Sequence, residues 1–258
     1  MTLSCDSPPP SAMPTPPTIL CNAQGERLDH AFHSASDGSG ELLVLIGHGV
    51  TGNKDRPWAV ALAEALAAAG YSSLRFSFSG NGDSEGDFRD STITKEVADL
   101  RTVVDAVTKA GFSHIAYAGH SMGGAVGVLA AAADPRLERL ISLAGMVYTA
   151  TFAATEFGEA TPGSGFMWEK PECPLSEAFV NDMNAIGDVL SQAPDIRVPW
   201  LLIHGEEDDV VPIQESRDIL ARAGSNATFV SLPGVDHVFS SERGLAAMIA
   251  TVLDWLGK

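Results

Sequence analysis

Cysteines, basic residues and long apolar runs are all scarce in this chain. Three cysteines, Cys5, Cys21 and Cys173, occur among 258 residues, too few and too scattered for a disulfide framework or a zinc site. We therefore expect a reducing, cytoplasmic compartment and neither a metal nor an organic cofactor. No apolar run approaches the roughly 20 residues of a membrane-spanning helix, so we expect no membrane partner.

Acidic residues outnumber basic ones, with 33 Asp and Glu against 16 Lys and Arg, and the formal net charge is −17. Such a charge repels nucleic acid and anionic lipid surfaces, and no basic patch offsets it. We therefore expect a small-molecule substrate as the partner, no nucleic acid, and a monomer or a homodimer.

The chain begins with a segment unlike the rest. Residues 1–17 hold six prolines and lack both the basic and the apolar region of a secretory signal. We interpret 1–17 as a disordered, proline-rich tail. Residues 18–258 are long enough for one α/β domain with a sizeable core.

Short apolar runs alternate with helical periodicity along that domain. Strands are expected at 42–46, 73–78, 114–118, 140–143, 200–203 and 228–232, and 18–23 with 27–33 should form a hairpin at the sheet edge. Continuous apolar strands separated by helices predict a doubly wound, mostly parallel sheet of about eight strands. Its ligands should bind near the carboxyl ends of the strands.

Residues 146–199 interrupt this rhythm, since they show no strand pattern. An insertion of this length in a compact domain is usually functional, so we expect a cap of short helices over the site, with a surface excursion as the alternative. Phe152, Phe166 and Trp168 are candidates for substrate contact, or else form the core of the cap. Its acidic residues outnumber Lys170 and Arg197, which disfavours anionic substrates.

The most informative motif is G-H-S-M-G at 119–123, between the apolar run 114–118 and a helical stretch. In this context G-x-S-x-G predicts a nucleophile elbow, a sharp and strained turn that exposes the Ser121 hydroxyl at a helix N-terminus. An ordinary glycine-rich turn is the alternative. The side chain of His120 should point away from the site.

A serine nucleophile needs a base, an orienting carboxylate and an oxyanion hole, and each is available at a strand end. His237 follows the strand 228–232, and the acidic run 206–209 follows 200–203. The segment H-G-V at 48–50 follows 42–46. The chain order of serine, acid and histidine is the one expected on an α/β-hydrolase fold.

These motifs, together with H-G-V-T-G-N-K at 48–54 and R-F-S-F-S-G-N-G-D-S-E-G at 75–86, resemble the α/β-hydrolase superfamily over about 18–258. Within it the chain is similar to the cinnamoyl and feruloyl esterase branch, which is often labelled by its similarity to serine aminopeptidases and monoglyceride lipases. The resemblance implies Ser121 as nucleophile and His237 as base. The family pattern H-G-x-x-D-x-x-V-P selects Asp208 as the acid, with Asp209 as its rival.

The resemblance also implies an oxyanion hole made by the backbone N–H groups of Val50 and Met122. His48 and Gly49 should lie beside the substrate, although the H-G turns that contain His48 and His204 favour structural hydrogen bonds. The loop 80–86 should shape the pocket wall.

We therefore expect a serine carboxylic-ester hydrolase that works through an acyl-enzyme. Its substrates should be small to medium, uncharged esters, including those of aromatic acids. The alternatives are a monoacylglycerol lipase or lysophospholipase, a serine aminopeptidase, a cofactor-free haloperoxidase, and a non-catalytic ligand receptor on the same fold.

Overall fold

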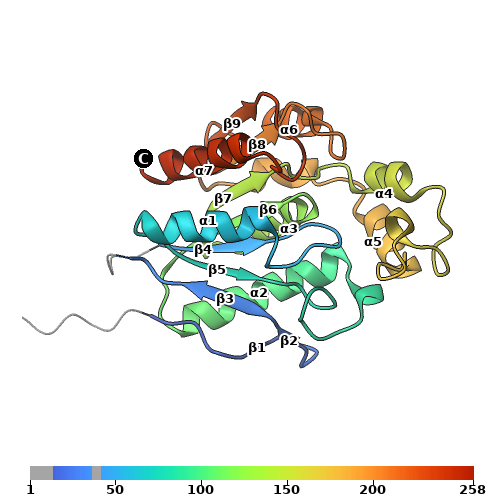
Figure 1. Cartoon of the computed structure of the whole chain (residues 1–258), viewed down its shortest axis with the longest axis horizontal. Helices are drawn as coiled ribbons and strands as arrows, with labels where there is room; N and C mark the ends of the chain where they lie inside the picture. The colour runs from blue at the N-terminus through green and yellow to red at the C-terminus, as the bar shows by residue number, and fades with distance from the viewer. Residues whose placement is uncertain (1–13, 37–41) are drawn as a thin grey trace, which may run out of the picture.

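The centre of the protein is a twisted sheet with helices on both faces (Figure 1). The computed structural model describes residues 14–36 and 42–258. Seven strands form this sheet in the order β3-β5-β4-β6-β7-β8-β9. They are β3 (His30–His33), β4 (Leu42–Gly47), β5 (Ser72–Phe76), β6 (His114–His120), β7 (Leu137–Leu143), β8 (Trp200–Gly205) and β9 (Ala227–Leu232). Only β3 pairs antiparallel within it, so the predicted doubly wound, mostly parallel sheet is confirmed.

The expected hairpin forms, but apart from the main sheet. β1 (Leu20–Cys21) and β2 (Arg27–Leu28) pair with each other alone, and β3 joins the main sheet after a break at Asp29. At the break, Asp29 N donates to the Ser84 hydroxyl (2.8 Å) and Asp29 O accepts from Ser77 N (2.8 Å), just after β5. In the described part of the chain the main sheet thus has seven strands, in agreement with the expected sheet of about eight.

Helices cover the two faces in separate layers. They are α1 (Pro57–Ala68), α2 (Ile93–Lys109), α3 (Met122–Ala133), α6 (Ile213–Leu220) and α7 (Glu242–Leu256), with a short 3₁₀ turn η1 (Phe88–Asp90) before α2. Leu43 and Leu45 of β4 share one core with α2 and α3, whereas Val44 and Ile46 share the other with α1 and α7. A strand buried on both faces requires the unbroken apolar run seen in the sequence.

Part of the segment expected to be a tail is described. Residues 1–13 lie outside the described residues, but Pro16 is buried and Pro17 O lies 3.1 Å from His30 Nε2. None of the helices in the described part of the chain is both long and apolar enough to cross a membrane.

Residues 146–199, called the insertion below, form short helices at one end of the sheet (Figure 1). They are α4 (Thr149–Phe157), η2 (Met167–Glu169), α5 (Glu177–Ile186) and η3 (Leu190–Asp195). Phe157 packs between Phe152 and Phe179, with ring centroids 5.8 and 6.0 Å away. These rings continue the hydrophobic core that β4, α2 and α3 share on one face of the sheet.

The insertion is tied to the sheet domain at its first residues. The buried carboxylate of Glu215, on α6, accepts hydrogen bonds from Val147 N (2.6 Å) and Tyr148 N (3.1 Å). The Tyr148 hydroxyl donates to Asp218 of the same helix (2.9 Å). These bonds fix the start of the insertion against α6 and so set the point from which α4 begins.

Candidate active site

Ser121 occupies a sharp turn between β6 and α3. Its φ and ψ are 54° and −120°, a conformation that costs energy for any residue with a side chain. The neighbouring glycines are required because a Cβ on Gly119 would lie 2.1 Å from Gly123 O. Ser121 N donates to Leu143 O of β7 (3.0 Å), which fixes the turn against the sheet. The strained strand-turn-helix geometry predicted from G-x-S-x-G is therefore present.

His237 and Asp208 meet by a direct hydrogen bond. His237 Nδ1 donates to Asp208 Oδ2 (2.8 Å), and Asp208 Oδ1 accepts from Val210 N (2.9 Å) and Val211 N (2.8 Å). The Asp208 side chain is fully buried, whereas Asp209 is exposed. The fold thus brings Asp208 to His237 and leaves Asp209, the alternative acid from the sequence, in solvent.

A second histidine supports the same carboxylate from β8. His204 Nε2 lies 2.8 Å from Val211 O and 3.1 Å from Asp208 Oδ2, and its Nδ1 lies 2.7 Å from Ser216 Oγ. Since both partners of Nε2 only accept, Nε2 carries the proton and the Ser216 hydroxyl donates to Nδ1. Burial raises the pKa of Asp208, but the hydrogen bonds from His204 and His237 outweigh burial and hold that pKa below its ordinary value.

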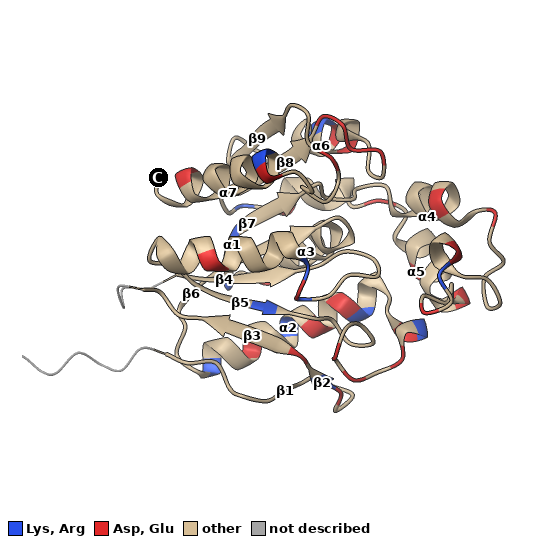
Figure 2. Ribbon diagram, in the orientation of Figure 1, with Lys and Arg blue, Asp and Glu red and all other residues tan. Residues whose placement is uncertain are grey.

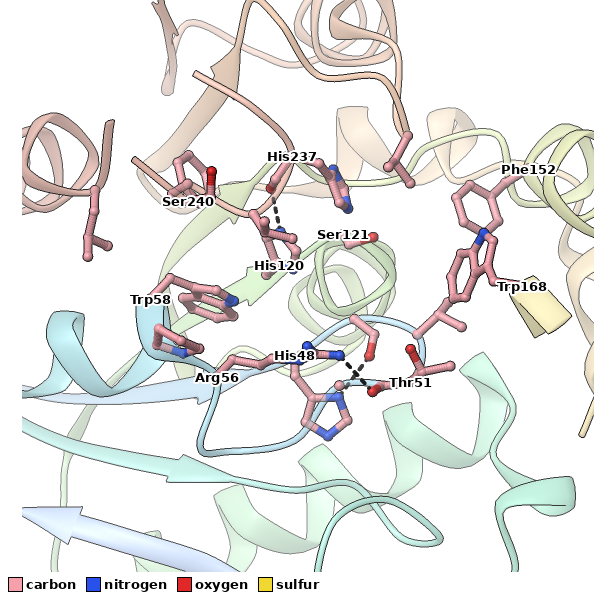
Figure 3. Close-up of a pocket in the computed structure, with 18 of the residues that line it drawn as sticks. His48, Thr51, Arg56, Trp58, His120, Ser121, Phe152, Trp168, His237 and Ser240 are labelled. Carbon is pink, nitrogen blue, oxygen red and sulfur yellow. Dashed lines mark hydrogen bonds between the residues drawn. The ribbon is translucent and has the colours of Figure 1, made fainter. Parts of the chain in front are cut away.

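The sequence predicted that the side chain of His120 points away from the site. In the structure, His120 lines the cavity instead. Its Nε2 donates to His237 O (2.8 Å), and its ring lies between Trp58 and His237, with centroids 5.0 and 4.7 Å away (Figure 3). Burial lowers the pKa of His120 to about 3, so the ring is neutral. The alternation of side chains along β6 would have predicted this orientation. Ala116 and Ala118 face the layer of α1 and α7, and His120, two residues further on, faces the same side of the sheet.

The loop after β4 lies against the turn at Ser121. A Cβ on Gly49 would lie 2.6 Å from Ser121 Cβ, so only glycine fits there. His48 Nδ1 donates to Gly49 O (2.9 Å), and its Nε2 accepts from Phe78 N (3.0 Å). Both ring nitrogens are thus occupied by backbone groups, and burial lowers the pKa of His48 to about 4. His48 is a structural residue that contributes its ring to the lining.

Two backbone N–H groups near Ser121 are available to a ligand. In the described part of the chain, neither Val50 N nor Met122 N donates to a protein acceptor. Met122 is the first residue of α3, where unpaired N–H groups and the helix dipole favour an anion. These are the donors expected of an oxyanion hole.

A cavity of about 520 Å³ joins these groups to the insertion. Ser121, His237, His48, Gly49 and Val50 line it, as do Phe152 and Trp168, which lie across Ser121 from Trp58 (Figure 3). Phe166 does not line the cavity, because its position in a bridge with Pro174 leaves it 42% exposed on the outside. Of the three aromatic residues expected to contact substrate, two are therefore placed to do so.

The charge of the lining differs from the charge of the insertion. Arg56 and Lys170 line the cavity, but not one Asp or Glu does among the residues that the structure describes. The acidic residues of the insertion thus lie outside the lining, and the charged side chains within it are cationic.

The loop 80–86 is not part of the cavity wall, contrary to expectation. It packs against the β1–β2 hairpin, where Arg27 N donates to Glu85 Oε2 (2.9 Å). Gly80 has a φ of 76°, and a Cβ there would lie 2.6 Å from Asp87 O. The loop therefore reaches the site only indirectly, through the bond from Phe78, just before it, to His48.

The sheet order, the strained serine turn and the Asp208–His237 pair define an α/β hydrolase. Within this class, the chain belongs to the prolyl oligopeptidase family, which matches residues 58–258. The match begins after the loop that carries His48 and Val50. Membership assigns the chain to the hydrolases.

Similar proteins include two whose activity or ligand is named. The human mitochondrial palmitoyl-protein thioesterase ABHD10 is 26% identical over 214 residues, which are 78% of this chain and 68% of that protein. The structure of Est1E from Butyrivibrio proteoclasticus with ferulic acid bound is 26% identical, with a TM-score of 0.80 over 94% of this chain and 100% of that one. Mouse ABHD10, at 21% identity and a TM-score of 0.77 over 93% of this chain and 98% of that one, supports the fold alone.

Proposed function

We propose that the protein is a serine ester hydrolase with Ser121 as nucleophile, His237 as base and Asp208 as the acid of a catalytic triad. The observation that carries this proposal is the 2.8 Å bond from His237 Nδ1 to the buried Asp208 carboxylate, beside a cavity that also exposes the strained Ser121. That bond places the proton on Nδ1 and leaves Nε2 free to accept one.

The reaction then follows from these positions. The Ser121 hydroxyl attacks the ester carbonyl carbon while His237 Nε2 takes its proton, and the carbonyl oxygen becomes an oxyanion. The N–H groups of Val50 and Met122 stabilise that charge, and one such donor is typically worth roughly 2.7–4 kcal/mol of barrier. The alcohol leaves with the proton from His237. Water, deprotonated by the same histidine, then releases the carboxylic acid and restores Ser121.

The cavity favours esters with an apolar or aromatic acyl group. Trp168 and Phe152 form an apolar wall opposite Trp58, and the cavity volume of about 520 Å³ suits a small to medium ligand. The Est1E structure holds ferulic acid, a phenolic acid with one aromatic ring. Methyl ferulate and short 4-nitrophenyl esters are therefore the substrates to test.

Thioester hydrolysis is the second candidate, because the similarity to ABHD10 supports it and the same acyl-enzyme serves both reactions. A serine aminopeptidase receives less support. Holding the substrate ammonium calls for a carboxylate, and none lines the cavity in the described part of the chain.

The test combines covalent labelling with activity. A fluorophosphonate probe should label the wild-type protein and not Ser121→Ala, and the wild type should hydrolyse at least one ester or thioester of the panel. If the folded wild type is neither labelled nor active, the chain is not a serine hydrolase. If Ser121→Ala keeps about a tenth or more of the activity, the nucleophile is another residue.

A further inference from the structure

Positive charge gathers in the cavity of a strongly acidic protein. The chain has a formal net charge of −17, and acidic ribbon segments are scattered over its elements (Figure 2). Yet the charged side chains of the cavity lining are Arg56 and Lys170, and no carboxylate lies with them among the described residues. The charged side chains that a substrate meets in the cavity lining are therefore both cations.

Arg56 keeps most of its hydrogen-bonding capacity. Arg56 is exposed, and its Nη2 donates to Thr51 O (2.9 Å) in the loop that carries Val50 (Figure 3). The carboxylate nearest in sequence, Asp55, is bound by Lys54 and Arg75 instead. Arg56 makes no ion pair within the described ranges, so its other N–H groups remain free for a ligand.

Lys170 is presented by a strained turn. The two residues before it, Trp168 and Glu169, have φ values of 47° and 57°, rare for residues with side chains. The turn is closed by bonds from Lys170 N to Met167 O (3.0 Å) and from Cys173 N to Lys170 O (2.9 Å). It brings Trp168 and Lys170 to the lining together. Strain of this kind persists where the surrounding structure holds it, often at ligand sites.

We propose that the cavity selects esters that carry a carboxylate, bound by Arg56 together with Lys170. This inference rests on the proposed hydrolysis at Ser121 and specifies its substrate class. A guanidinium matches a carboxylate with two parallel N–H donors, and the ammonium of Lys170 adds a second positive charge to the same lining. The carboxylate belongs either to the acyl part or to the alcohol part of the ester.

The experiment compares matched esters that differ only in charge. For the acyl part, the pair is the mono-4-nitrophenyl ester of adipic acid and the same ester of adipic acid monoamide. For the alcohol part, the pair is 4-acetoxybenzoate and 4-acetoxybenzamide. The wild type should show a higher kcat/KM for the carboxylate in at least one pair, by about fivefold or more at low salt, and the preference should shrink as sodium chloride is added.

Arg56→Gln and Lys170→Gln should each reduce that preference, mainly through KM, and the double variant should abolish it. Arg222→Gln is the matched control, because Arg222 is an exposed cation outside the lining, and it should keep the wild-type ratio. A wild type that hydrolyses both members of each pair equally overturns the inference while leaving the proposed function intact. A double variant that retains the wild-type ratio also overturns it, and so does an Arg56→Gln that slows both esters equally.

Discussion

His120 Nε2 donates a hydrogen bond to the backbone carbonyl of His237, at a distance of 2.8 Å. The bond crosses from the end of β6, one residue before Ser121, to the loop after β9. It therefore ties the candidate base directly to the segment that carries the candidate nucleophile. Burial lowers the pKa of His120 to about 3, so the ring that makes this bond is neutral.

His120→Phe keeps an aromatic ring against Trp58 and removes the donor. We expect kcat for a 4-nitrophenyl ester to fall about tenfold with little change in KM, because the base is less well placed while the cavity is unchanged. His30→Phe is the control, because the His30 ring also contacts backbone carbonyls but lies outside the cavity. Equal effects of the two substitutions would contradict a positioning role.

The second prediction separates two neighbouring acids. Asp208→Asn should lower kcat by about 10⁴-fold, because an amide fails to hold the His237 tautomer and to stabilise its imidazolium. Asp209→Asn should stay within about twofold of the wild type, since surface substitutions rarely matter. Steady-state kinetics on one ester, after circular dichroism has verified folding, distinguish the two acids. The opposite ranking would move the acid to Asp209.

Local sequence patterns predicted the strands and the serine turn of the candidate active site, and there is a physical reason for each. A run such as Leu42–Gly47 is apolar because both faces of β4 are covered, and a G-x-S-x-G turn needs glycine because backbone atoms approach within the reach of a Cβ. Both constraints act between near neighbours in the chain, so one sequence displays them.

Other features depend on contacts between distant segments. Phe166 and Trp168 are two residues apart, but the positive φ at Trp168 sends one outward and the other into the cavity. Asp55 forms its ion pairs with Lys54 and Arg75, so among the described residues Arg56 has no carboxylate partner. Strand alternation gives the face of β6 on which His120 lies, but its partner, the His237 carbonyl, is 117 positions away. A local sequence pattern does not identify contacts between residues so far apart in the chain.

The third prediction concerns a buried acid away from the cavity. Glu96 is buried, its Oε1 accepts from Ser91 Oγ (3.2 Å), and its Oε2 has no partner in the described structure. Burial, and then the nearby charge of Asp99, raise the pKa of Glu96 well above its ordinary value. The folded state therefore retains the proton of Glu96 to a higher pH than the unfolded state does. Stability from this group is fully present below the unfolded pKa and is lost as the pH rises through the folded pKa.

Glu96→Gln mimics the protonated acid and removes this loss. Below about pH 4.5 the variant and the wild type should unfold with similar free energies, and at higher pH the variant should become the more stable, by up to roughly 1.4 kcal/mol per pH unit. Urea unfolding at pH 5, 7 and 9 measures the difference. Glu64→Gln, at an exposed carboxylate, is the control and should show no such trend. A constant difference between the Glu96 variant and the wild type across this range would show that Glu96 is ionised in the folded state.

The last prediction tests whether the insertion selects the acyl group. Trp168 lines the cavity and Phe166 does not, although both are exposed aromatic residues of the same short segment. Trp168→Ala should lower kcat/KM for methyl ferulate about tenfold or more while sparing 4-nitrophenyl acetate, because an apolar wall contributes binding to the large acyl group only. Phe166→Ala should leave the ratio of the two activities unchanged. The Trp168 ring also packs against Phe157 and donates to Glu156, so thermal unfolding of both variants must first show that the insertion is intact. If Trp168→Ala is folded and keeps the wild-type ratio, or if Phe166→Ala changes it equally, the insertion does not choose the substrate through this wall.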